Sequence, residues 1–112
     1  MNDIKDITNA LIEFRDERDW AQFHDSKNLA CAISIEAAEL NELFLWKTIK
    51  ESEEVSRDLI KGELADIFAF AFLLANKHGL DVKDIVLDKI AANDKKYPIE
   101  KSKGTAKKYN EL

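Results

Sequence analysis

The scarcity of turn-forming residues is the feature that most constrains this chain. Its 112 residues include only three glycines and one proline. Sandwiches and barrels need turn residues between many short strands, so this scarcity favours long helices. Hydrophobic residues make up 46% of the chain, which is enough for a packed core and argues against a disordered protein. We therefore expect an all-α fold, and the length suits one domain.

Hydrophobic spacing predicts four helices in a single domain of residues 1–98. The mixed polar and aromatic segment 20–28 predicts a connector. Gly79 predicts a helix stop, Asp81 predicts the N-cap of the last helix, and Pro98 ends that helix. The predicted helices span about residues 3–19, 29–46, a start between 52 and 59 to 78, and 82–97. Residues 99–112 are predicted to form a basic C-terminal tail.

Charge is distributed unevenly along the chain. The net charge is −5, yet residues 101–112 carry +3 from four lysines and one glutamate, which leaves −8 for residues 1–100. So acidic a body lacks the basic face that binds duplex nucleic acid, but it can attract cations. The longest apolar run, residues 67–75, is far shorter than the ~20 residues that span a bilayer. We expect neither duplex nucleic acid nor a membrane as a partner.

The single cysteine, Cys31, excludes a disulfide framework and a cysteine-based zinc site. It predicts a reducing, cytoplasmic compartment, and we expect it to be a small core residue. The N-terminal residues are amphipathic and acidic, so we do not expect them to be a signal peptide.

Two pairs of acids fall on helix faces that otherwise look core-facing. On a helical wheel at ~100° per residue, Glu36 falls inside the apolar stripe of residues 29–46, and Glu39 lies at its edge. Glu63 is likewise surrounded by apolar residues on the next helix, and Asp66 lies at the border. Side chains at this spacing are roughly 5–6 Å apart, which is close enough to share one ligand.

A buried carboxylate without a partner is costly, so buried acids are paired, protonated or metal-bound. The two helices offer few basic partners, of which Lys61 and Lys77 are the nearest. All-oxygen ligands select a hard divalent cation, Mg²⁺ or Mn²⁺. The alternative is a solvated acidic face, and pattern alone leaves both interpretations open. A solvated face is what we expect for Glu42, Glu51, Glu53 and Glu54.

The last predicted helix carries polar residues on its core-facing side. Val82 and Val86 share a face with Lys89, Asn93 and Lys96. Two interpretations stay open for the polar residues. They are salt-bridge partners of the acids, or they hold the phosphates of a ligand that the metal also binds.

The acidic pairs belong to a longer set of motifs. The runs Glu36-Ala-Ala-Glu39 and Glu63-Leu-Ala-Asp66 resemble the E-x-x-E … E-x-x-D signature of the MazG-like all-α nucleoside triphosphate pyrophosphohydrolases. Further runs resemble the dCTP pyrophosphatase branch of that family: FRDERDWAQFH at 14–24, NL at 28–29, LFLW at 43–46 and KIAANDKKYP at 89–98. One E-x-x-E is weak evidence, but two acidic pairs together with these runs are specific. The resemblance covers roughly residues 10–98.

The resemblance implies a Mg²⁺-dependent enzyme that cleaves a nucleoside triphosphate between its α and β phosphates, releasing a monophosphate and pyrophosphate. It implies that dCTP or a modified deoxynucleotide is the substrate, in nucleotide-pool cleaning. It also implies a four-helix bundle-like fold that assembles as a dimer or tetramer. The site residues that it implies are Glu36, Glu39, Glu63 and Asp66 for catalysis and metal binding, Trp20, Phe23, His24 and Trp46 for the base, and Lys89, Asn93 and Lys96 for the phosphates.

The sequence departs from the family pattern at two places. Phe70 stands one turn after Asp66, where a tyrosine is frequent, and residues 25–27 replace a proline-containing turn. Both departures bear on base preference more than on the chemistry. Phe68 and Phe72 lie on the side of their helix away from Glu63, which predicts a contact between subunits.

The positions of the acids and histidines also bear on three other classes of helical protein. A non-catalytic helical dimer that binds basic partners is disfavoured by the core-facing positions of Glu36 and Glu63. A phosphoribosyl-ATP pyrophosphohydrolase-like enzyme has the same architecture and stays open. A di-iron bundle needs Glu-x-x-His pairs, which neither His24 nor His78 provides.

Overall fold

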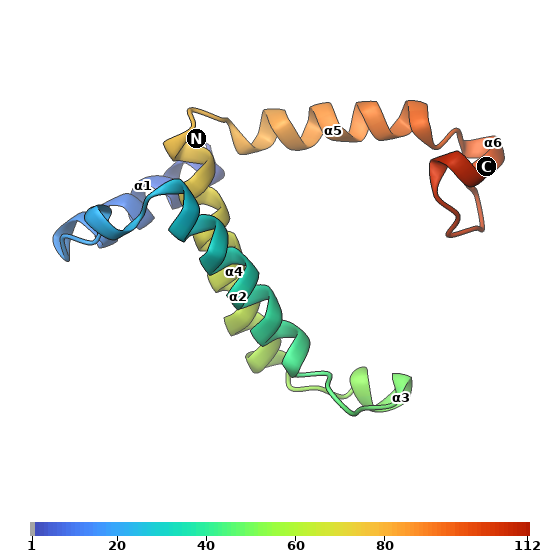
Figure 1. The fold of residues 1–112 in the computed structure, drawn as a ribbon, viewed down its shortest axis with the longest axis horizontal. Coiled ribbons are helices and arrows are strands. Elements are labelled where there is room, and N and C mark those ends of the chain that lie inside the picture. The colour runs from blue at the N-terminus through green and yellow to red at the C-terminus, as the bar shows by residue number, and fades with distance from the viewer. Residues whose placement is uncertain (1) are drawn as a thin grey trace. The chain divides into compact units, whose positions relative to one another are not determined.

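The computed structural model describes residues 2–112, and all regular structure in that range is helical (Figure 1). The expected all-α class is confirmed. Four helices are long: α1 (Asp3–Glu17), α2 (Ser26–Glu42), α4 (Arg57–Lys77) and α5 (Val82–Lys96). The short elements are the 3₁₀ turn η1 (Ala21–Phe23), α3 (Ile49–Ser52), α6 (Ile99–Ser102) and the 3₁₀ turn η2 (Tyr109–Glu111).

The chain forms two compact units. The first ends at Gly79 and contains α1 to α4, and the second begins at Leu80 and contains α5, α6 and η2. In the first unit α2 and α4 lie side by side as an antiparallel pair that is connected through α3, and α1 packs on α4 (Figure 1). None of the described helices is both long enough and apolar enough to cross a membrane.

The interior of the first unit is thin. Leu29, Leu73 and Ala75 are the only buried side chains within residues 2–112. Phe68 on α4 is 54% exposed, so the helix pair presents more apolar surface than its own packing covers. Cys31 is also exposed, and the expectation that it is a core residue was wrong. It lies about 200° around α2 from Leu29, so it falls on the opposite face of the helix.

Side-chain caps set the helix starts. Asp81 accepts a hydrogen bond from the backbone amide of Asp84 at 3.0 Å and begins α5, as predicted. Asp25 accepts one from the backbone amide of Asn28 at 2.7 Å. This cap begins α2 at Ser26, three residues before the predicted start.

The turn between α2 and α4 differs most from expectation. α2 ends at Glu42, four residues before the predicted end. Trp46 then adopts a positive φ of 64°, a conformation that is strained for a bulky residue. Thr48 and Glu51 form a capping box that begins α3, which is too short for hydrophobic spacing to reveal.

The C-terminal end of α4 follows the prediction closely. Its last residue is Lys77, one residue before the predicted end, and Gly79 has the left-handed φ of 65° that a helix stop requires. His78 Nε2 lies 2.9 Å from Ser26 Oγ. This hydrogen bond joins the end of α4 to the beginning of α2.

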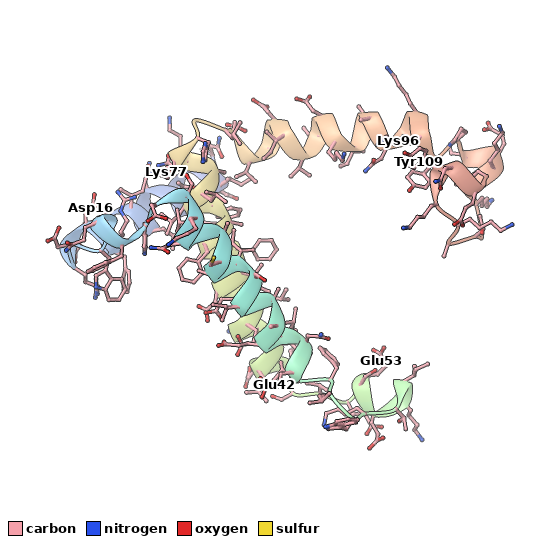
Figure 2. The ribbon with its side chains drawn as sticks, viewed as in Figure 1. Asp16, Glu42, Glu53, Lys77, Lys96 and Tyr109 are labelled. Carbon is pink, nitrogen blue, oxygen red and sulfur yellow. The ribbon has the colours of Figure 1, made fainter. Side chains whose placement is uncertain are left out.

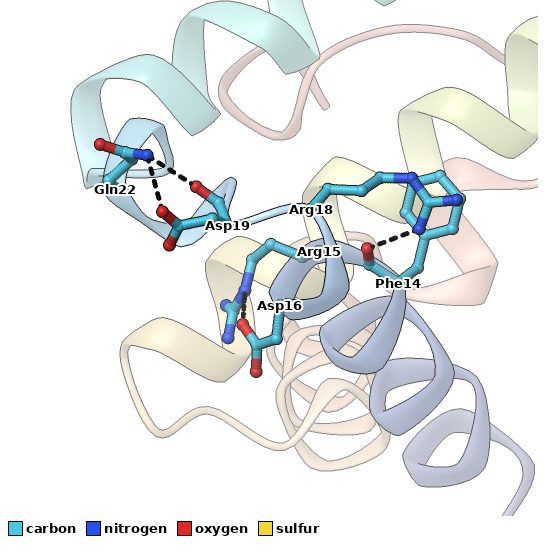
Figure 3. A network of polar contacts seen from close by, with 6 residues as sticks. All are labelled: Phe14, Arg15, Asp16, Arg18, Asp19 and Gln22. Atoms are coloured by element: carbon cyan, nitrogen blue, oxygen red, sulfur yellow. Dashed lines mark hydrogen bonds and ion pairs between the residues drawn. The ribbon is translucent and has the colours of Figure 1, made fainter.

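Polar contacts hold the segment between α1 and α2 (Figure 3). Arg18 Nη1 donates a hydrogen bond to the Phe14 carbonyl oxygen at 2.9 Å, and its guanidinium carbon lies 3.7 Å from the Phe14 ring centroid. Gln22 Nε2 donates to the carbonyl oxygen and to Oδ2 of Asp19, at 2.9 and 3.2 Å. The edge of Trp20 meets the Phe14 ring with centroids 5.8 Å apart. The predicted connector is therefore an ordered loop rather than a loose linker.

In the second unit the residues after α5 are also ordered. Pro98 follows the end of α5, then come α6, a turn at Gly104 with φ 80° and η2. Tyr97 and Tyr109 pack edge to face with centroids 6.2 Å apart. Residues 99–112, which we expected to be a basic tail, thus fold back to the end of α5.

Candidate active site

Three glutamates converge where α2 packs against α4. Glu36 and Glu39 lie one turn apart on α2, and Glu63 comes from α4. One carboxylate oxygen from each of the three lies within 4.8 Å of the others. The helix pair thus brings the acids of two distant motifs into one cluster, the glutamate cluster.

The environment of the cluster favours the protonated form of Glu36 and Glu63. Burial raises the pKa of Glu36 to about 7, and hydrogen bonding and repulsion from Glu39 add to the shift. Burial also raises the pKa of Glu63, again with a contribution from Glu39. Close acids that cannot all be ionised hold protons near neutral pH unless a cation replaces those protons.

Two oxygens of the cluster have no partner. Oε2 of Glu36 and Oε2 of Glu63 are buried and make no hydrogen bond. The only ion pair among the described residues of the first unit joins Arg15 to Asp16, so no lysine or arginine of that unit neutralises the cluster. An all-carboxylate donor set with orphaned oxygens fits a hard divalent cation. It is an acidic cluster of the kind that holds metal in the family that the sequence resembles.

Asp66 is placed differently from the three glutamates. It is exposed on α4, one turn after Glu63, and its oxygens are not among those within 4.8 Å of one another. Its charge nevertheless helps to raise the pKa values of both Glu36 and Glu63, so it lies near the cluster. Its role as a fourth metal ligand stays a prediction.

His24 links the connector to the same face of α4. Its ring meets the edge of Phe70 with centroids 6.3 Å apart, and its Nδ1 is buried without a hydrogen-bond partner. Burial lowers the pKa of His24, and the positive charge of Arg15 lowers it further. Because Phe70 lies one turn after Asp66, a neutral imidazole stands about one helical turn from the acidic region.

The expected base-contacting aromatics divide into two groups. Trp20 and Phe23 are 43% and 58% exposed in the connector beside His24. Trp46 is 92% exposed and follows the other end of α2, whose 17 residues span about 25 Å. One chain therefore does not bring Trp46 together with Trp20.

Lys89, Asn93 and Lys96 belong to the second unit. Their spacing places them along one face of α5, where Asn93 is half-buried and both lysines are exposed. The Lys96 ammonium lies 5.1 Å from the centroid of the Tyr109 ring. Sequence pattern does not predict this contact, because nothing in residues 99–112 shows where the chain turns back.

Known proteins are similar to this chain in sequence and in fold over most of its length. The profile of the MazG-like family matches residues 31–112. The chain is 38% identical to dCTP pyrophosphatase 1 of Bos taurus and 36% identical to that of Homo sapiens. Both alignments cover 97% of this chain, and they cover 68% and 67% of the relatives.

The fold is similar to the crystal structure of a pyrophosphatase from Archaeoglobus fulgidus DSM 4304. The TM-score is 0.83 at 34% sequence identity, over 88% of this chain and 94% of that one. Sequence and fold both match enzymes, which decides against the non-catalytic helical dimer.

Proposed function

This chain belongs to the MazG-like family and is a nucleotide pyrophosphohydrolase, and from that premise we propose that it hydrolyses dCTP or a modified deoxynucleoside triphosphate with Mg²⁺. The products are the nucleoside monophosphate and pyrophosphate. The names of the two pyrophosphatase 1 relatives support dCTP as the first candidate.

One observation carries the metal dependence. Buried oxygens of Glu36 and Glu63 lack partners, and no lysine or arginine among the described residues of the first unit neutralises their cluster. A divalent ion held by the glutamate cluster, with Asp66 nearby on α4, satisfies those oxygens. When bound, the ion supplies Lewis-acid chemistry that draws charge from phosphate oxygens and acidifies water.

Side chains of the protein activate the water and stabilise the leaving group. A cluster carboxylate that does not contact the ion orients the attacking water and accepts its proton. The water oxygen then bonds to the α-phosphorus, and the bond from that phosphorus to the bridging oxygen breaks. Lys89, Asn93 and Lys96 offset the charge on the departing pyrophosphate.

The connector holds the nucleoside in this proposal. Trp20 and Phe23 offer exposed ring faces on which a base can stack. The orphaned Nδ1 of His24 offers one hydrogen bond to the base or sugar. The lowered pKa keeps that imidazole neutral at physiological pH, so it can serve as donor or acceptor.

We propose further that at least two copies assemble. Trp46 reaches a base pocket with Trp20 only if another copy supplies it, because the two lie at opposite ends of α2. The exposed ring of Phe68 is covered in the same assembly. Sedimentation at micromolar concentration should give a multiple of 12.8 kDa, and a mass near 12.8 kDa would contradict the assembly.

A nucleotide panel tests the substrate. The chain is given each dNTP and NTP with Mg²⁺, and pyrophosphate and orthophosphate are scored separately. We expect pyrophosphate, with dCTP or a modified deoxynucleotide turned over fastest. Orthophosphate with a diphosphate, or full activity in chelator, would overturn the proposal. Phosphoribosyl-ATP belongs in the panel, because its preferential cleavage would move the enzyme to the other branch considered above.

A further inference from the structure

The segment after α5 brings an aromatic ring to a lysine. α6 and the turn at Gly104 reverse the chain, and η2 returns Tyr109 to the last turn of α5. Figure 2 shows Lys96 and Tyr109 close together there, and the lysine ammonium is 5.1 Å from the ring centroid. That distance lies within the range of a cation–π contact.

Several contacts keep the ring in this position. Tyr97, the neighbour of Lys96 in sequence, packs against Tyr109 at 83° with centroids 6.2 Å apart. The Glu111 carboxylate accepts a hydrogen bond from the amide of Lys108 at 3.4 Å, and the Thr105 hydroxyl accepts one from the amide of Lys107 at 3.3 Å. The ring is thus part of an ordered segment.

The contact with the Tyr109 ring restricts the rotamers of the Lys96 side chain. A lysine side chain has four rotatable bonds and loses substantial rotamer entropy when it is fixed on a ligand. A ring face attracts the ammonium and leaves N–H donors available for phosphate oxygens. Lys89 on the same helix makes no contact of this kind among the described residues, so Lys96 alone of the two is pre-positioned.

We propose that Tyr109 is a positioning residue for Lys96 and that the C-terminal segment is therefore part of the phosphate-binding machinery. This inference rests on the proposed function through the role of Lys96 in holding phosphates. It assigns a purpose to residues 99–112 that their basic composition alone does not suggest.

A double-mutant cycle tests the inference. Tyr109→Leu removes the ring and should raise KM about two- to five-fold for every nucleotide, with kcat nearly unchanged. Tyr109→Phe keeps the ring and should restore the parent KM. In a Lys96→Met background, Tyr109→Leu should have no further effect on KM. An equal effect of Tyr109→Leu in both backgrounds would mean that the ring only supports the fold, and would overturn the inference.

Two readouts separate this inference from the proposed function. Ring-current shifts of the Lys96 ε-methylene protons should be present in the parent and in Tyr109→Phe and absent in Tyr109→Leu. Calorimetry with inorganic pyrophosphate and Mg²⁺ should show the same cycle as KM. A parent that binds pyrophosphate in a Tyr109-dependent way but hydrolyses no nucleotide would contradict only the proposed function. A parent without the ring-current shift would contradict only the inference.

Discussion

The acids of the first unit and the lysines of the second are held by different means. Glu36, Glu39 and Glu63 project from two helices that pack along each other, and this packing brings one carboxylate oxygen of each within 4.8 Å of the others. Lys89 and Lys96 extend from an exposed helix face, and of these two only Lys96 has a described aromatic contact. The glutamate cluster is therefore formed by helix packing within the first unit, at a cost in desolvated carboxylates. The position of Lys96 depends on the short segment that returns Tyr109 to the end of α5.

Loss of one carboxylate of the glutamate cluster should have the largest effect. Glu63→Gln keeps the volume and removes the charge of a proposed metal ligand, so turnover should fall by at least about 100-fold while the melting temperature is retained. Steady-state pyrophosphate release measures it. Glu42→Gln, an exposed glutamate on α2, is the matched control and should keep parental activity. Full activity of Glu63→Gln would show that the cluster is not the metal site.

Trp20 and Lys89 should show different substrate dependence. Trp20→Ala removes a stacking ring, so KM should rise by the equivalent of roughly 1–3 kcal/mol and base preference should weaken. Lys89→Ala should weaken all nucleotides alike, because every one carries the same phosphates. The ratios of kcat/KM across the four dNTPs measure both effects, with Lys83→Ala on another face of α5 as control. The division of roles fails if Trp20→Ala leaves base preference unchanged while Lys89→Ala alters it.

The cluster should couple stability to pH and metal. The raised pKa of Glu36, about 7, means that the folded metal-free chain binds more protons than the unfolded chain between about pH 4.5 and 7. Its stability should therefore fall as pH rises through that window. Mg²⁺ must displace those protons, so its stabilising effect should grow over the same range. Thermal unfolding at pH 6 and pH 8, with NaCl of equal ionic strength as control, measures this. Equal Mg²⁺-induced shifts at both pH values would contradict it.

The smallest expected effect concerns Phe70. Phe70→Tyr adds a hydroxyl to the ring that meets His24, whose Nδ1 has no partner. We expect base preference to shift by about two- to ten-fold, the scale of one hydrogen bond, with little change in kcat for the best substrate. The ratio of kcat/KM for dCTP to that for dTTP measures the shift. Phe72→Tyr on α4 is the control, and an equal shift in that variant would remove Phe70 from the specificity argument.

The helical period explains why the glutamate cluster could be predicted from sequence. Acids at i, i+3 share a face whatever the tertiary fold, and the apolar residues around Glu36 and Glu63 indicate which face packs. The start of α5 at the Asp81 cap and the end of α4 before Gly79 could also be predicted, because helix capping and a left-handed φ are local requirements.

Other features depended on contacts that sequence spacing does not encode. The predicted end of α2 lies four residues beyond the observed end at Glu42. The chain turns at Trp46 with a positive φ, which is rare for tryptophan and therefore not predictable from its residue type. α3 did carry a readable signal in the Thr48-x-x-Glu51 capping box, which hydrophobic spacing ignores. The return of residues 99–112 brings Tyr109 to Tyr97, a pairing that only the folded chain shows.

The small interior of this chain has a consequence for its abundance in the cell. Among residues 2–112 a protomer buries only Leu29, Leu73 and Ala75, so it gains little from folding alone, and we expect its folded fraction to rise with its own concentration. At low expression, protomers without a partner copy would then be open to proteases, while assembled ones would be protected. Gene dosage would consequently act on the lifetime of this enzyme as well as on its amount.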